Sequence, residues 1–125
     1  MENKLLRVRN ATKGTVVADR AWIADTSEKR RTGLLKHTGL KEGEGLWIVP
    51  TEGIHMFGMK FDIDVMFLNK QRKVLKVSSN MASSGFSRRM SLCLSAHSVL
   101  ELPAGMADKT RTQAGDQLEL EKYDG

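Results

Sequence analysis

The sequence predicts a mainly β, β-rich α+β fold: an antiparallel β sandwich or barrel, jelly-roll-like, with two short helices. Apolar and β-branched residues gather in short stretches that turn residues separate, such as Lys13-Gly14 and Gly115-Asp116. Strand and helix patterns do not alternate as they do in parallel nucleotide-binding sheets. With 125 residues and no internal repeat, the chain is expected to form one domain over residues 1–125.

The N-terminal third predicts a hairpin followed by a helix. Residues 6–9 alternate in polarity, Lys13-Gly14 makes a turn, and residues 15–24 are β-branched and aromatic. Glu28 stands three residues after Asp25, a spacing that satisfies free N–H groups at a helix start. We therefore expect a helix over 27–36 that ends at Thr38-Gly39.

The remaining elements follow from apolar runs bounded by Gly, Pro and polar turns. Residues 78–91 are small, polar and basic, which indicates a long loop. Pro103 suits the first position of a second helix over 104–109. The further strands are expected at 46–49, 54–57, 63–68, 74–77, 97–102 and 117–123.

Composition limits the classes of function. The charge balance of 20 basic and 15 acidic residues gives +5, but the basic residues form short, separated clusters without a nucleic-acid-binding motif. Nucleic-acid binding is therefore not expected, and the partner is expected to be a small molecule or a protein. The longest apolar runs are too short for a membrane span or a secretory signal, and Cys93 is the only cysteine, so we expect a cytoplasmic protein.

Several motifs make the chain similar to a known family. They are Gly33-Leu34-Leu35, Phe57-Gly-Met59-Lys60, Ile63-Asp64-Val-Met-Phe67, Ala96-x-x-Val99-Leu100-Glu101-Leu102-Pro103-Ala104-Gly105 and Gly115-Asp116. Over residues 26–120 the chain resembles the bacterial and archaeal domain of unknown function 192. This resemblance implies a compact β-rich fold with small helices, and it implies no activity. The chain departs from the family pattern at Asp62, where relatives often have proline.

Three types of polar side chain could carry chemistry. Asp62 and Asp64 lie two residues apart, so an extended strand places both carboxylates on one face. They could bind a divalent cation, or Asp62 could be solvated while Asp64 accepts backbone hydrogen bonds. His55 could join Asp64 and Glu101 in a cluster if the fold brings their strands together. Glu101 lies between two leucines, so its carboxylate must be paired, exposed or functional.

The leading hypothesis is a binding module without catalysis and without a cofactor. We expect an aromatic and methionine cluster beside a basic loop to receive a small or extended ligand, anionic because of the loop arginines. The candidate ligand-binding residues are Trp47, His55, Phe57, Met59, Asp64, Phe86, Arg88, Arg89 and Glu101. One alternative is a metal-assisted hydrolase that uses His55, Asp62, Asp64 and Glu101. Another is an interaction protein that offers a sheet edge or basic face to a protein or RNA.

Overall fold

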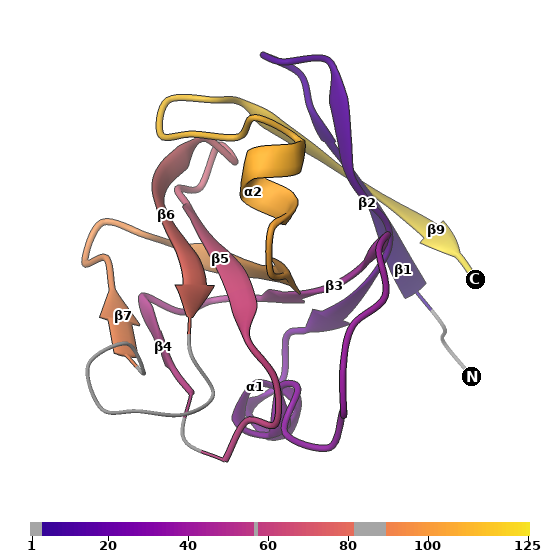
Figure 1. The fold of residues 1–125 in the computed structure, drawn as a ribbon, viewed down its shortest axis with the longest axis vertical. Coiled ribbons are helices and arrows are strands. Elements are labelled where there is room, and N and C mark those ends of the chain that lie inside the picture. The colour runs from indigo at the N-terminus through magenta and orange to yellow at the C-terminus, as the bar shows by residue number, and fades with distance from the viewer. Residues whose placement is uncertain (1–3, 57, 82–89) are drawn as a thin grey trace.

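A curled β-sheet forms the body of the molecule (Figure 1). The computed structural model describes residues 4–56, 58–81 and 90–125, and these contain nine strands and two α-helices. Seven strands form one sheet in the order β6-β5-β8-β3-β2-β1-β9, and β4 and β7 form a separate two-stranded ribbon. The elements are β1 (Lys4–Asn10), β2 (Thr15–Ala24), α1 (Ser27–Thr32), β3 (Glu44–Ile48), β4 (Gly53–His55), β5 (Ile63–Leu68), β6 (Val74–Met81), β7 (Met90–Leu92), β8 (Ser98–Pro103), α2 (Met106–Lys109) and β9 (Leu118–Asp124).

The β-rich class and the two short helices are confirmed, whereas the purely antiparallel pairing differs at one place. Strands β2 and β3 are parallel. The chain leaves the end of β2 and returns through α1 and the segment after it, so that β3 runs in the same direction as β2. The two edge strands, β6 and β9, approach each other through a bridge between Lys73 and Gln117. The sheet is therefore curled, with its edges joined at this point in the described part of the chain.

Each face of the sheet covers its own apolar core. All seven strands and α2 contribute to the first, which we call the inner core and which includes Met66, Leu100 and Met106. The second, the outer core, includes Phe67, Val99 and Leu34, the last of which lies just after α1. Successive side chains of a strand point to opposite faces, so β5, with all six residues buried, supplies both cores.

Helix α1 is shorter than the sequence predicted. Its N-cap is Thr26, whose hydroxyl oxygen accepts a hydrogen bond from the Lys29 N–H at 3.1 Å. The helix ends at Thr32 because Gly33 has φ +49°, a backbone conformation that is incompatible with continuing the helix. Gly33 thus starts the turn that places Leu34 in the outer core.

Three other boundaries differ from the prediction. The expected loop over 78–91 contains the end of β6 and the first two residues of β7, while residues 82–89 lie outside the described ranges. Pro103 is the last residue of β8 and not the first of α2. Strand β4 ends at His55, before Phe57, which also lies outside the described ranges.

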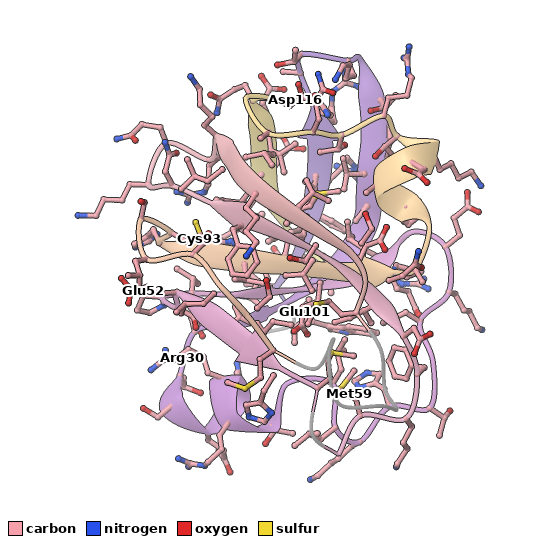
Figure 2. All side chains as sticks on the ribbon, turned by 60° about the vertical axis from the view of Figure 1, so that its left-hand side comes forward. Arg30, Glu52, Met59, Cys93, Glu101 and Asp116 are labelled. Carbon is pink, nitrogen blue, oxygen red and sulfur yellow. The ribbon has the colours of Figure 1, made fainter. Side chains whose placement is uncertain are left out.

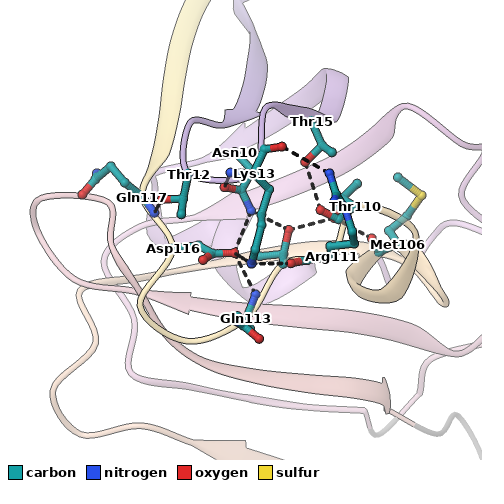
Figure 3. A network of polar contacts seen from close by, with 11 residues as sticks. Asn10, Thr12, Lys13, Thr15, Met106, Thr110, Arg111, Gln113, Asp116 and Gln117 are labelled. Carbon is teal, nitrogen blue, oxygen red and sulfur yellow. Dashed lines mark hydrogen bonds and ion pairs between the residues drawn. The ribbon is translucent and has the colours of Figure 1, made fainter.

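A polar network ties the turn after β1 to the segment after α2 (Figure 3). The Asn10 side-chain amide donates to Thr112 Oγ1 and to Asp116 Oδ2, both at 3.0 Å. Lys13 Nζ and the Gln113 N–H donate to the same oxygen of Asp116. Burial acts to raise the pKa of Asp116, but these hydrogen bonds and the charge of Lys13 together hold it below 3.8. The network therefore fixes the approach of β9 to β1.

Within the described ranges, the helices are too short to cross a lipid bilayer.

Candidate functional site

Asp64 is a buried carboxylate whose hydrogen bonds are internal to the fold. Its side chain is 0% exposed on β5. Oδ1 accepts a hydrogen bond from the Asn80 N–H at 2.8 Å, and Oδ2 accepts from the N–H groups of Gly105 and Ala107 at 3.0 and 2.8 Å. Three charge-assisted bonds compensate for the lost hydration of the carboxylate and fix the start of α2 against the sheet. Asp64 therefore has a structural role on the side of the sheet that faces the inner core.

Glu101 lies on the next strand, β8, but on the opposite face of the sheet. It stands opposite Val65 and Leu46, which belong to the outer core, and it is 6% exposed. Within the described ranges no hydrogen bond or ion pair reaches its carboxylate. Burial raises the pKa of Glu101 to about 7 because the charged form is poorly solvated. A buried acid without a partner is costly, and such groups are found preferentially at functional sites.

The Glu101 side chain lines a cavity of about 280 Å³ under α1, which we call the Glu101 cavity. Arg30 and Arg31 line the cavity from α1. His55 lines it from β4, and Met59 lines it from the segment after β4. Figure 2 shows Glu101 between the helix that carries Arg30 and the segment that carries Met59. The residues that line the cavity thus include an acid, two arginines, a histidine and a methionine.

Local interactions hold the walls of this cavity. The Arg30 guanidinium donates to the Val49 carbonyl at 3.2 Å and to Ser27 Oγ at 3.4 Å, so α1 is anchored to the residue after β3. On the opposite wall, a Cβ added to Gly53 would lie 3.0 Å from the Ser91 carbonyl oxygen and from Leu92 Cδ1. The absence of a side chain at Gly53 therefore allows β4 and β7 to pair closely.

The structure brings together only part of the predicted binding site. His55, Met59 and Glu101 line the Glu101 cavity. Trp47 lies in the inner core, on the other side of the sheet, where the Arg72 guanidinium carbon is 4.9 Å from the centroid of its ring. Phe57, Phe86, Arg88 and Arg89 lie outside the described ranges, so their roles stay predictions.

The possible cluster of His55, Asp64 and Glu101 is not formed, because the sheet separates Asp64 from the other two. Asp62 is exposed, and it does not line the cavity. Among the described residues, no three His, Cys, Asp or Glu side chains are grouped so that they could hold a metal ion. The geometry therefore gives no support to a metal-assisted hydrolase.

Arg30 and Arg31 were not among the residues that the sequence pointed to. The cluster Lys29-Arg30-Arg31 is one of several short basic clusters in the sequence, and nothing in it distinguishes Arg30 or Arg31. The helical position of this cluster was predicted, but the contact of the helix with the residue after β3 was not. A half-buried Arg30 that bonds a backbone carbonyl across 19 residues is a tertiary feature with no local signature.

The fold and the cavity define a class: small β-rich proteins in which one curled mixed sheet separates two cores and carries a buried acid beneath a short helix. Residues 8–120 match the family model of DUF192, described as uncharacterized ACR. The chain belongs to the DUF192 family, and the predicted resemblance is confirmed.

Relatives with the name UPF0127 protein come from two archaea. The chain is 32% identical over 117 residues to the protein from Thermococcus sibiricus, covering 90% of this chain and 73% of the relative. It is 31% identical over 112 residues to the protein from Thermococcus gammatolerans, covering 86% and 70%. Neither name describes an activity.

Two crystal structures share the fold. A Novosphingobium aromaticivorans protein of unknown function superposes with a TM-score of 0.76 at 24% identity, covering 92% of this chain and 83% of that chain. A Sinorhizobium meliloti protein, whose description mentions transcription regulation, gives a TM-score of 0.75 at 21% identity and covers 95% of both chains. At these identities the likeness shows the fold alone.

Proposed function

We propose that this protein is a binding module without catalysis, whose Glu101 cavity receives a small polar molecule. One observation carries the proposal: a buried carboxylate that has no hydrogen bond or ion pair with the described residues lines a cavity of about 280 Å³. An internal acid that served only packing would be replaced at lower cost by an apolar residue, because desolvation opposes its charged form. A ligand that donates hydrogen bonds to Glu101 removes this cost when it binds.

The charges around the cavity indicate the chemistry of the ligand. Glu101 suits an ammonium, amide or hydroxyl group, whereas Arg30 and Arg31 suit a carboxylate. The cavity volume lies just below the usual range for small-molecule sites, which favours a molecule with few heavy atoms. Together these features favour a small zwitterion of the amino-acid type.

Protonation gives the proposal a distinctive signature. Because the pKa of Glu101 is about 7, its carboxylate is mostly protonated at pH 6 and mostly ionised at pH 8. An ammonium group binds the ionised form, so affinity should increase as the pH rises through about 7. A ligand that recognised only the arginines would lack this dependence.

Thermal-shift measurements with the standard amino acids test the proposal. Matched probes lack one charge each: primary amines without a carboxylate, and carboxylic acids without an amine. At least one amino acid should raise Tm more than its matched amine and acid do. Glu101→Gln should abolish the shift and Arg31→Ala should reduce it, whereas Asp108→Asn, an exposed acid outside the cavity, should preserve it.

Either of two results would contradict the proposal. One is an amino-acid shift that Glu101→Gln leaves unchanged, because the ligand would then bind elsewhere. The other is the absence of a shift with every probe, which would remove the assignment of a zwitterion.

A further inference from the structure

A second and larger depression lies on the other side of α1. It has a volume of about 840 Å³, and Thr32 and Gly33 line both this groove and the Glu101 cavity. The far wall is built by the first residues of β1 and the last of β9, which pair as Lys4 with Asp124. We call it the Trp22 groove.

An aromatic pair forms one wall of the Trp22 groove. Trp22 of β2 and His37, from the turn after α1, have ring centroids 5.0 Å apart and an interplanar angle of 48°. Trp22 is half-buried, packed against the outer core on one side while it lines the groove. A rigid indole at the surface of a groove is a good platform for a planar ring.

Lysines from a helix, a turn and a strand supply positive charge to the same groove. Lys29 lies on α1, Lys36 follows the helix, and Lys122 lies on β9; within the described ranges none of the three makes an ion pair. Lys4 also lines the groove, but its ammonium contacts Asp124 at 2.7 Å. Two carboxylates, Asp25 and Glu28, line the groove as well, against the three lysines that make no ion pair within the described ranges.

From this arrangement we infer a second binding site, separate from the Glu101 cavity, for an anionic small molecule that carries a planar ring. The ring lies against Trp22 and His37, and its phosphate or carboxylate is held by Lys29, Lys36 and Lys122. The volume fits a ligand the size of a mononucleotide. A nucleotide and an aromatic carboxylate share this chemistry, and the test separates them.

Isothermal titration of the unmodified protein tests the inference with four probes. Adenosine monophosphate and 1-naphthoate carry both a ring and a negative charge, adenosine lacks the charge, and inorganic phosphate lacks the ring. At least one ring-bearing anion should bind at least about tenfold more tightly than adenosine and phosphate. Absence of binding by both ring-bearing anions at millimolar concentration overturns the inference.

Two matched triple variants locate the site. Lys29→Glu/Lys36→Glu/Lys122→Glu should weaken binding by at least about tenfold. Lys60→Glu/Lys70→Glu/Lys73→Glu changes the net charge equally at exposed positions outside the groove and should leave binding within about twofold. Equal weakening in both variants would show that the probes sense only the net charge, and would overturn the inference.

Trp22 provides a readout of ring contact. The other tryptophan, Trp47, is buried in the inner core, so quenching by a bound ring should come from Trp22. Trp22→Leu should remove both the quenching and the preference for ring-bearing anions, with binding of phosphate unchanged. Glu101→Gln should leave all four probes unaffected, which separates this site from the proposed function.

Discussion

Asp64 and Glu101 are buried carboxylates on adjacent strands, yet they face opposite sides of the sheet and differ in their hydrogen bonding. Asp64 stands opposite Leu102 and Glu101 opposite Val65, so the two acids are neighbours in register and face opposite sides of the sheet. Three backbone N–H groups satisfy Asp64, whereas the described residues give Glu101 no partner. Burial alone does not identify a functional acid, because the presence or absence of hydrogen bonds separates a structural carboxylate from a candidate site.

Removing the Asp64 carboxylate should have the largest effect. Asp64→Ala leaves the N–H groups of Asn80, Gly105 and Ala107 without their acceptor in a buried setting. We expect the free energy of unfolding to fall by about 3–5 kcal/mol, measured by urea denaturation. Asp108→Ala, at an exposed acid of α2, should change it by less than about 0.5 kcal/mol. A loss equal to that of the control would remove the structural assignment of Asp64.

Replacing Glu101 with Gln should instead raise the free energy of unfolding relative to that of the wild type, by an amount that increases with pH. Because the folded-state pKa of about 7 lies above the ordinary 4.5, the folded protein binds the proton more tightly than the unfolded chain does. The wild-type free energy of unfolding should therefore fall by about 3 kcal/mol, through this residue, as the pH rises from about 4.5 to above 7.

Glu101→Gln does not titrate, so its stability relative to the wild type should increase by that amount over the same pH range. Urea denaturation of both proteins at pH 4.5, 6 and 8 measures the difference. A constant difference across this range would show that burial does not perturb Glu101, and the contrast with Asp64 would then disappear.

The network around Asp116 offers an intermediate test on the α2 side of the sheet. Asn10→Ala removes the amide that donates hydrogen bonds to Thr112 and Asp116. We expect the free energy of unfolding to fall by about 2 kcal/mol. Because the pKa of Asp116 is lowered, the stability it contributes is present above pH 3.8 and is lost as the pH falls through the folded-state value. Acid titration of the wild type should show this loss, and Asn10→Ala should shift it to higher pH. Arg9→Ala, at the exposed neighbour, should leave both measurements nearly unchanged.

The smallest effect is expected at the cap of α1. Thr26 caps this helix locally, while Asp64 contacts the start of α2 from a distant strand. Thr26→Ala should lower the free energy of unfolding by about 1 kcal/mol because the cap is exposed and a water molecule can replace it. Thr38→Ala, at an exposed threonine in the following turn, provides the control. A loss as large as that of Asp64→Ala would mean that α1 is as important to folding as α2.

Part of the candidate site could be predicted from residues alone. Glu101 was identified because it interrupts Leu100 and Leu102, and that reasoning applies in any β-strand. His55 and Met59 are among the candidate ligand-binding residues that the sequence predicted, and both line the cavity. Arg30 and Arg31 were missed, because the packing of α1 over β3 depends on contacts that no local pattern encodes.

The position of Asp64 shows where alternation is ambiguous. Strict alternation along this strand would place Ile63, Val65 and Phe67 against the core and Asp64 toward solvent or a groove. All six residues of β5 are instead buried. Met66 and Leu68, on the same face as Asp64, were the available signal, because a nearly continuous apolar run indicates a strand that is covered on both faces.

By itself the sequence determined the β-rich class, the opening hairpin, most strand positions and the family, because these depend on local periodicity, turn residues and short motifs. Only the tertiary structure decided which side of the sheet each acid faces and what covers it. Periodicity shows which side chains share a face, but the groups that cover that face come from distant parts of the chain. Asp64 is satisfied by N–H groups 41 and 43 residues away, while Glu101 faces a cavity under a helix some 70 residues before it.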